Sequence, residues 1–391
     1  MTDNLDLSTL RDSVTTLPET DIVSVSTYGW DRQGLIPLWF GEGDVPTPSF
    51  ISDAAHEALA RGETFYTDQN GIADLRHALR VYNKQTFDAD LSDDRITVTN
   101  SGMMAISLAM QMLVEAGDEV VVIGPVWPNI YSTIEVNQGV ATHATIRLSE
   151  EGWSLDLDEL FAVVTGRTKA IFLNSPGNPT GWIMPEADQA RLLSFARERD
   201  IWILSDEVYH TLVFDRRVAF SMLQLARPHD KVIAINSFSK SWLMTGWRMG
   251  WMVHPEGLSP TIAKLIQIST SGVPQFIQRA GIAALTGGDE VIKDLRTRCQ
   301  TGRDIVFDRL ETWPRVRATR PNGAFYAFFA VDGVTDSLSF CKELIDRCNV
   351  GLAPGSAFGP SGEGYLRLCY ASTPEKLQQA MDALETVIGG R

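Results

Sequence analysis

Short apolar runs and longer amphipathic stretches alternate over most of the chain. Apolar residues recur at steps of three and four in residues 50–61 and 72–87, which predicts two helices. From residue 96 to residue 253, short apolar runs are separated by stretches with helical periodicity. Strands that alternate with helices of this length indicate a mostly parallel sheet with helices on both faces.

The elements of this alternating region are predicted as follows. The expected strands are 96–100, 119–124, 140–148, 169–174, 201–205, 232–236 and 248–253. The expected helices between them are 103–115, 127–137, 155–164 and 185–199. After residue 259 the pattern is more helical, with one long helix at 289–311 and a smaller α+β portion after it.

Length and pattern together predict two domains, because 391 residues are too many for one simple core. We expect a segment at 1–48 that joins the smaller domain, a large domain at 49–288 and the smaller C-terminal domain at 289–391. The predicted fold class is therefore α/β: a mostly parallel sheet covered by helices on both faces, plus a smaller α+β domain.

Composition and charge narrow the class of protein without indicating its chemistry. Hydrophobic residues make up 44% and charged residues 21%, which is ordinary for a globular protein. The net charge of −15 argues against binding to nucleic acid or to an anionic membrane surface. The N-terminal residues lack the pattern of a signal peptide, and no apolar run approaches the ~20 residues needed to span a bilayer. We therefore expect a cytoplasmic protein.

The cysteines and histidines give no sign of a metal site. The four cysteines lie in the last quarter of the chain without paired spacing, which predicts reduced thiols. The six histidines show no ligand spacing. His210 is close to a candidate site residue, Tyr209, but neighbouring residues of a strand point to opposite faces. We therefore expect His210 to have a structural role.

The strongest chemical signal follows the expected strand at 232–236. Ser237, Ser239 and Lys240 lie in the loop after this strand, and Arg248 follows shortly afterwards. Ligands of α/β sheets bind at the carboxyl ends of the strands. Two hydroxyls and an arginine fork suit a phosphate, which leaves Lys240 free to form an imine. A solvated surface lysine is the alternative for this loop taken alone.

Three other candidates also follow buried strands and so lie at the same edge of the sheet. Asn178 lies in a turn rich in proline and glycine, for which turn chemistry alone is the alternative. Asp206 needs a cationic or hydrogen-bonding partner, because burial of an isolated acid is costly. A protonated pyridine nitrogen would be such a partner, and Tyr209 could donate to the phenolic oxygen of the same ring. Gly102 lies directly before the expected helix at 103–115, whose first amides form a ready anion site that Gly102 allows a ligand to approach closely.

Together these segments resemble the fold-type I pyridoxal 5′-phosphate (PLP) dependent aminotransferases of the class I/II, or aspartate aminotransferase, family. The similarity runs in order along almost the whole chain, although each motif alone is weak. The motifs lie at residues 41–44, 65–67, 125–127, 178–181, 206–209, 237–240, 321–326 and 365–367.

The resemblance implies that Lys240 carries PLP as an internal aldimine and moves the proton during transamination. Lys240, Asp206 and Tyr209 are then the catalytic residues. Asp206 would hold the ring nitrogen protonated, and Trp127 would stack on the ring. Asn178 and Tyr209 would contact its phenolic oxygen. The residues expected around the phosphate are Ser101, Gly102, Met103, Ser237, Ser239 and Arg248.

The same resemblance implies a homodimer with shared active sites, because Tyr66 would reach the phosphate of the neighbouring subunit. The substrates would be an L-amino acid and a 2-oxo acid, which react in turn by a ping-pong mechanism. Arg367 would bind the substrate α-carboxylate, assisted by Asn178 and the main-chain amide of Gly41, while Trp127 would also contact the substrate.

One position departs from the pattern of bacterial aspartate aminotransferases. Several of them have a lysine directly after the phosphate-binding glycine, where it binds the distal carboxylate of the substrate. This chain has Met103 there, which favours a less polar side-chain pocket. Trp30, Phe40 and Phe276 are candidate walls of that pocket, and ordinary core or interface packing is the alternative for each.

Two other functions compete with transamination. A PLP-dependent C–S β-lyase of the same fold would share Lys240, Asp206, Arg248 and Arg367, because fold and cofactor do not fix the reaction. A non-enzymatic regulatory domain would need an attached DNA-binding segment. The first 30 residues or so show no basic cluster and no helix-turn-helix pattern, which disfavours that function.

Overall fold

An eight-stranded sheet forms the centre of the structure, a computed structural model in which residues 7–390 are described. In spatial order its strands are β2 (Ile96–Thr99), β9 (Gly250–Val253), β8 (Val232–Ser237), β7 (Trp202–Asp206), β6 (Thr168–Asn174), β3 (Glu119–Gly124), β4 (Val140–Ser149) and β5 (Gly152–Leu155). The pairs from β8 through β4 are parallel, whereas β9 and β5 run antiparallel to their neighbours. The predicted α/β class and its mostly parallel sheet are confirmed.

The period-two pattern of the strands builds a core on each face of this sheet. On β3, Val120 and Val122 join one cluster, and Val121 and Ile123 join the other. The first face is covered by α5 (Gly102–Leu113), α6 (Asn129–Val136) and α10 (Ser259–Ser269). The second is covered by α7 (Leu157–Ala162) and α8 (Glu186–Arg199).

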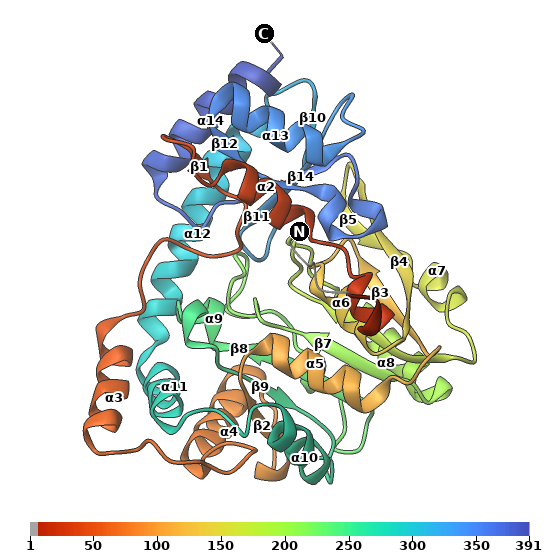
Figure 1. Cartoon of the computed structure of the whole chain (residues 1–391), viewed down its shortest axis with the longest axis vertical. Coiled ribbons are helices and arrows are strands. Elements are labelled where there is room, and N and C mark those ends of the chain that lie inside the picture. The colour runs from red at the N-terminus through yellow and green to blue at the C-terminus, as the bar shows by residue number, and fades with distance from the viewer. Residues whose placement is uncertain (1–6, 391) are drawn as a thin grey trace, which may run out of the picture.

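The β2–β9 end of the sheet has its own group of helices. Figure 1 shows α3 (Ser49–Ala60), α4 (Ala73–Phe87) and α11 (Gln275–Gly287) gathered there with α10. Apolar residues of α3, α4 and α11 form one buried cluster with β2 and β9. The packing of these helices fixes both ends of the segment between α3 and α4 and places that segment beside α11.

The prediction of a helix at 155–164 was wrong at its beginning. Residues Gly152–Leu155 form β5, which pairs with the end of β4 as a hairpin. Gly152 has a φ of 112°, which side-chain-bearing residues rarely adopt, and so permits this tight reversal. The helix starts only after Asp156, whose carboxylate accepts hydrogen bonds from the amides of Asp158 and Glu159.

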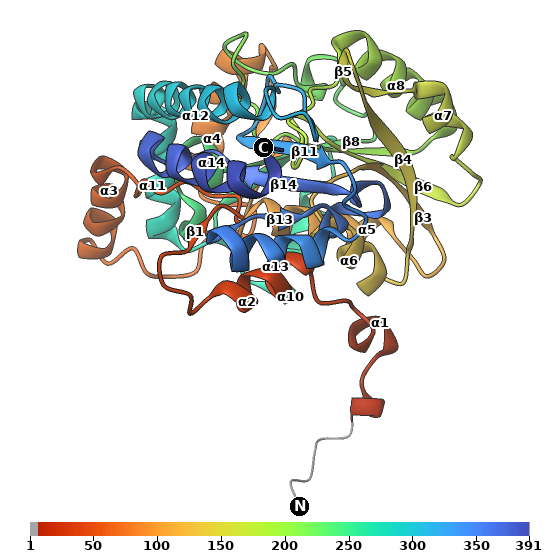
Figure 2. The same ribbon diagram turned by 90° about the horizontal axis from the view of Figure 1, so that it is seen from above.

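A second, antiparallel sheet contains β10 (Val316–Arg317), β11 (Tyr326–Val331), β14 (Tyr365–Cys369) and β13 (Ala353–Pro354). Its core is shared with α12 (Asp289–Leu310), α13 (Ser337–Cys348) and α14 (Pro374–Ile388). The early part of the chain also lies here: β1 (Ile36–Pro37) pairs with β12 (Val350–Gly351), and α2 (Asp21–Gly29) packs beside α13 (Figures 1 and 2). A short α1 (Asp12–Thr15) precedes α2. The domain boundaries at residues 48 and 288 stay a prediction.

Membrane-spanning helices, metal-binding clusters and disulfides can be looked for directly in residues 7–390. Within residues 7–390 no helix is both long enough and apolar enough to cross a membrane. Over the same range, no cluster of histidine, cysteine and acidic side chains has the arrangement of a metal site. The cysteines are free thiols, of which Cys299, Cys341 and Cys369 are buried.

Candidate active site

A cavity of about 390 Å³ lies where β6, β7 and β8 end, and it is closed by residues of the antiparallel sheet and of the N-terminal segment. Most residues expected at the site line it: Gly41, Gly102, Met103, Trp127, Asn178, Asp206, Tyr209, Ser237, Ser239, Lys240, Arg248 and Arg367. Ser101 and Tyr66 do not line it. Segments far apart in the sequence thus meet at one edge of the sheet, as α/β architecture predicts.

Lys240 reaches the cavity from a short helix. The segment after β8 was predicted to be a loop, but residues Phe238–Ser241 form the one-turn helix α9, capped by the Ser237 hydroxyl. Lys240 Nζ donates a hydrogen bond of 2.6 Å to the Gly41 carbonyl. Burial lowers the pKa of its amine to about 8, and the nearby Cys369 and Glu42 oppose that shift. An amine with this pKa is partly neutral near physiological pH, which a nucleophile or base requires.

Asp206 is buried at the end of β7 without a cationic partner in the described structure. Within residues 7–390 its carboxylate accepts one hydrogen bond, a long one of 3.3 Å from the Val208 amide. Burial, together with the charge of Glu207, raises the pKa of the carboxyl to about 7, although the Val208 amide and the charge of Lys240 oppose this shift. Glu207 itself accepts hydrogen bonds from Ser205, Ser221 and the Met222 amide. Asp206 therefore accepts fewer hydrogen bonds than Glu207, and it lines the cavity.

Arg367 is a buried cation, only 2% exposed, that forms no ion pair with any carboxylate of residues 7–390. Its Nη1 donates to Asn178 Oδ1 at 3.0 Å, and its Nη2 donates to the Trp39 carbonyl. The guanidinium lies 4.6 Å from the ring centre of Tyr326 and 4.9 Å from that of Phe358. Its Nε is buried and has no partner. A buried guanidinium with a free donor is a site for a carboxylate.

Tyr209 and Tyr326 form a hydrogen-bonded pair beside these groups, with 2.8 Å between their hydroxyl oxygens. Tyr326 lies in the motif at residues 321–326 but was not predicted as a site residue.

The expectation that His210 has a structural role fits its position, because it is buried and does not line the cavity. The reason given was wrong: Tyr209 and His210 lie in a turn. His210 is held by Tyr82 and the Glu207 carbonyl, and burial lowers the pKa of its imidazole to about 4.

Backbone amides and hydroxyls gather at the far side of the cavity. Gly102 is the first residue of α5, and the Ser101 hydroxyl caps that helix by accepting from the Met104 amide at 3.1 Å. Ser237 donates to Ser239 at 2.8 Å, and the exposed Arg248 guanidinium lines the same side. A helix N-terminus, two hydroxyls and a guanidinium together favour an anion.

The remaining wall of the cavity is mostly apolar. Met103 and Ile106 contribute from α5, Ile22 from α2, and Phe40 from the segment after β1. Asn129, at the start of α6, is a polar exception. Of the three aromatic residues considered for this wall, only Phe40 lines the cavity; Trp30 is 71% exposed and Phe276 packs against the cluster of α3, α4 and α11.

Sequence reasoning missed several lining residues, including Asn174, Tyr326, Ile22 and Asn129. Asn174 could have been found, because it ends a buried strand directly before the turn that carries Asn178. Its amide oxygen accepts from the Asn178 amide at 2.8 Å and fixes that turn. Ile22 had no such signal, because only the tertiary fold brings α2 to the cavity.

Comparisons with known proteins give one consistent picture. The chain matches the family described as aminotransferase class I and II over residues 36–384. It is 34% identical over 360 residues to an aspartate aminotransferase of Thermotoga maritima, which covers 92% of this chain and 93% of the relative. It is 33% identical over 361 residues to aromatic-amino-acid aminotransferase 2 of Thermococcus litoralis, covering 91% and 92%.

The fold agrees with these matches. A mutant of the Thermus thermophilus aspartate aminotransferase superposes with a TM-score of 0.91 at 30% identity. The superposition covers 97% of this chain and 99% of that one. The similarity in fold therefore extends over nearly the whole chain.

Proposed function

The chain belongs to the aminotransferase class I and II family and is an aminotransferase, and from this premise we propose that PLP is its cofactor and that Lys240 carries it. One observation supports the proposal above all. Lys240, Asp206 and Arg367 are ionisable groups that converge on one cavity, and none of them forms a direct ion pair with another residue of 7–390. Burial of unpaired charges is costly, so a fold retains them where a ligand completes the pairs.

The residues around the cavity fit each part of this cofactor. Asp206 would hold the ring nitrogen protonated, since a carboxyl with a pKa of about 7 ionises readily once a cation lies beside it. Tyr209 and Asn178 would donate to the phenolic oxygen, and Trp127 would cover the ring face. The phosphate would lie among the amides of Gly102 and Met103, the Ser237 and Ser239 hydroxyls and Arg248, with Ser101 orienting the first turn of α5.

The substrate would be held by its α-carboxylate. Arg367 offers its unpartnered Nε, and Asn178 and Gly41 line the same cavity. Asn178 already accepts from Arg367 Nη1, so the guanidinium is oriented before the substrate binds. Such preorganisation lowers the entropic cost of positioning the reacting carbon.

Proton transfer falls to Lys240. When bound, PLP supplies an aldehyde that condenses with amines and an electron-withdrawing ring that stabilises negative charge at the substrate Cα. Once its amine is released by the incoming substrate, Lys240 Nζ takes the proton from Cα as a general base. Its pKa of about 8 suits this exchange near neutral pH. Asp206 would stabilise the charge that develops, because its carboxylate would pair with the protonated ring nitrogen of the bound cofactor.

We also propose that the protein acts as a homodimer with shared active sites. Tyr66 is 91% exposed and does not line the cavity of its own chain. An exposed tyrosine of this kind is available to a neighbouring subunit, where its hydroxyl would donate to the cofactor phosphate. Phe65, beside it, is 80% exposed and would be covered by the same association.

A half-reaction distinguishes an aminotransferase from a C–S β-lyase. With an amino acid alone, the holoenzyme should convert its cofactor absorbance to that of the amine form, and one equivalent of 2-oxo acid should appear per site. A lyase would instead release ammonia and pyruvate continuously from a cysteine conjugate. Ammonia release without the change in absorbance would contradict the proposed function.

We further propose that the side-chain pocket prefers apolar or aromatic amino acids over aspartate. Ile22, Phe40, Met103 and Ile106 line the cavity, and its three cationic residues, Lys240, Arg248 and Arg367, are assigned here to the cofactor and the α-carboxylate. A distal carboxylate would therefore lose its hydration there without gaining a cation. In a screen of amino donors, Phe, Leu and Met should react at least as well as Asp.

Met103→Lys tests this preference directly. We expect the substitution to raise kcat/KM for aspartate relative to phenylalanine by about tenfold to a hundredfold, the range of a charge-assisted hydrogen bond. Met103→Gln is the matched control, because it adds polarity without charge and should leave the ratio nearly unchanged. Exclusive use of aspartate by the unmodified protein would refute the proposed preference.

A further inference from the structure

The segment between α3 and α4 presents its two aromatic residues to solvent although it is firmly held on either side. Phe65 and Tyr66 are 80% and 91% exposed, and Tyr66 is the most exposed large hydrophobic residue of the described chain. Neither belongs to a buried cluster. Two adjacent exposed aromatic side chains on a surface segment are usual for a site of protein association.

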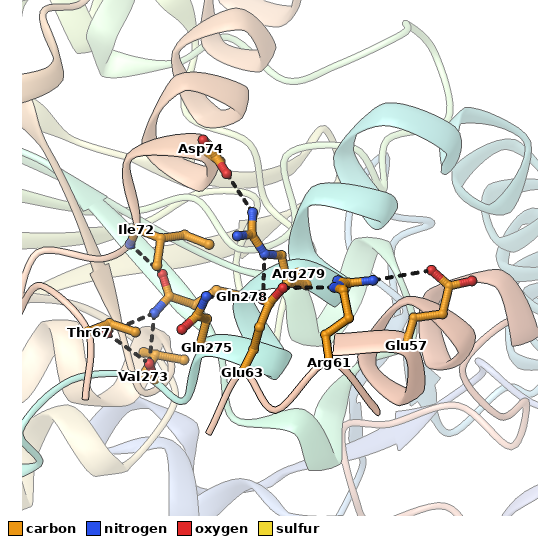
Figure 3. A network of polar contacts seen from close by, with 10 residues as sticks. All are labelled: Glu57, Arg61, Glu63, Thr67, Ile72, Asp74, Val273, Gln275, Gln278 and Arg279. Atoms are coloured by element: carbon orange, nitrogen blue, oxygen red, sulfur yellow. Dashed lines mark hydrogen bonds and ion pairs between the residues drawn. The ribbon is translucent and has the colours of Figure 1, made fainter. Parts of the chain in front are cut away.

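One side of the segment is held by Glu63. Its carboxylate accepts from Arg279 Nε at 2.8 Å, from Arg61 Nε at 2.9 Å and from Gln275 Nε2 at 3.0 Å (Figure 3). Arg279 also pairs with Asp74 of α4 through Nη1. The hydrogen bonds from Arg279 and Arg61 lower the pKa of the Glu63 carboxyl, so it stays charged near neutral pH.

The other side is held by Gln278, which is fully buried. Its Oε1 accepts from the Ile72 amide at 2.7 Å, while its Nε2 donates to the Val273 carbonyl at 2.7 Å and to Thr67 Oγ1 at 3.2 Å (Figure 3). A buried amide that uses both of its ends in this way fixes the backbone on either side of it.

Apart from the hydrogen bond from Arg61, the C-cap of α3, the side chains that make these contacts come from one helix. Gln275, Gln278 and Arg279 are spaced i, i+3 and i+4 on α11, so their side chains share one face. Gly281, further along α11, lies against the Met249 and Phe238 side chains, which are next to the Lys240 segment; a Cβ at Gly281 would be 2.5 Å from Met249 Cε. Helix α11 therefore contacts the segment that carries Phe65 and Tyr66 and also the residues that flank Lys240 in the same chain.

We propose that Arg279 and Gln278 are positioning residues that hold Phe65 and Tyr66 outward, in the pose in which a second copy of this chain receives Tyr66 at its phosphate site. This inference rests on the proposed homodimer with shared sites. Because the segment is ordered before association, dimer formation does not have to order it. The Tyr66 hydroxyl can then bind the phosphate of the neighbouring subunit without an additional entropic cost. Arg279 thus acts on the neighbouring site through Tyr66.

The test is a double-mutant cycle on the full-length protein with Arg279→Met and Tyr66→Phe. The readouts are the dissociation constant of PLP, obtained by titration of the apoprotein, and hydrogen exchange of residues 62–72. We expect Tyr66→Phe to weaken PLP binding about tenfold and Arg279→Met to weaken it about three- to tenfold. The double variant should bind PLP no more weakly than Tyr66→Phe alone, and kcat at saturating PLP should stay within about twofold for Arg279→Met.

Three control variants separate this effect from a general loss of stability. Arg309→Met removes an arginine that pairs with two carboxylates, Asp382 and Glu385, elsewhere in the chain, and it should leave PLP affinity unchanged. Arg279→Lys retains the charge and should restore part of the affinity. Glu63→Gln weakens the same contact from the other side and replaces Arg279→Met if that variant does not fold.

The outcomes distinguish the positioning role of Arg279 from the proposed shared active site. If Tyr66→Phe weakens PLP binding but Arg279→Met and Glu63→Gln do not, the positioning role is wrong and the shared active site stands. If the effects of Tyr66→Phe and Arg279→Met on affinity are additive, Arg279 does not act through Tyr66 and the inference is overturned. If Tyr66→Phe has no effect on a protein shown to be dimeric by sedimentation, the shared site itself is wrong.

Discussion

Replacing Lys240 by alanine should abolish transamination and the covalent attachment of PLP together. The variant loses the only lysine that lines the cavity of the described chain, and with it the base for the Cα proton. General acid–base catalysis alone contributes about 10²- to 10⁴-fold, so a loss of kcat of at least about 10⁴-fold is expected when the attachment point is lost as well. Steady-state assays and the visible absorbance of the reconstituted protein measure the two effects.

The control for this variant is Lys264→Ala, which removes an exposed lysine on α10. It should keep both the absorbance and the activity. Because the Lys240 side chain donates only one hydrogen bond within residues 7–390, to the Gly41 carbonyl, its removal should leave the circular dichroism spectrum unchanged. Substantial turnover by a folded Lys240→Ala protein would show that another group attaches the cofactor, and the assignment of the site would fail.

The convergence of the candidate site residues was predictable from the sequence wherever it depends on the ends of parallel strands. Asp206 and Ser237 each end a buried apolar strand, and Asn178 and Lys240 follow such strands closely. Parallel strands bring their carboxyl ends to one edge, so a local pattern was enough to predict that these residues meet. The cavity lined by all four confirms that they do.

The sequence did not predict the parts of the site that depend on tertiary packing between distant segments. Tyr326 reaches Tyr209 from the antiparallel sheet, and Ile22 reaches the cavity from α2. No periodicity relates such positions. The contact of Glu63 with Arg279 is another case, because it joins residues 216 positions apart. A local pattern predicts which face of a helix is polar, but not which charged residue it meets.

Local turn chemistry explains the errors in the boundaries of elements. The helix expected at 155–164 starts only at Leu157, because the Gly152 turn first completes a hairpin and Asp156 then caps the helix. Apolar periodicity alone does not distinguish the end of a short strand from the first turn of a helix. The Lys240 segment was expected to be a loop for a similar reason, since one helical turn is too short to show a period.

Replacing Asp206 by asparagine should have opposite effects on catalysis and on the stability of the apoprotein. Asparagine cannot hold the ring nitrogen of the cofactor in its protonated form, so kcat should fall by about 10²- to 10³-fold, as for the loss of one preorganised electrostatic group. The apoprotein, however, should become more stable at pH 8. Burial raises the pKa of Asp206 from 3.8 to about 7, so the unfolded chain loses this proton at a lower pH than the folded one.

The sign of the pH dependence follows from that difference. Below about pH 3 the carboxyl is mostly protonated in both states, and the two apoproteins should have similar unfolding free energies. As the pH rises from about 3 to 7, the unfolding free energy of the unmodified protein falls. The reason is that the unfolded chain releases the Asp206 proton in this range, whereas the folded protein either keeps the proton or buries an ionised carboxylate. The loss is complete above pH 7 and amounts to about 4 kcal/mol at most, from a shift of about three units. Urea denaturation at pH 4.5 and pH 8 measures it.

Asp294→Asn, at an exposed position of α12, is the matched control and should show neither effect. Glu207 and Lys240 remain in both apoproteins, so their own titration cancels from the comparison to first approximation. If Asp206→Asn keeps normal kcat, Asp206 does not face the ring nitrogen. If it loses activity without gaining stability at pH 8, the carboxyl is already satisfied without a cofactor. Only the combination of lost activity and gained stability indicates a buried acid that the fold retains for a cation supplied by PLP.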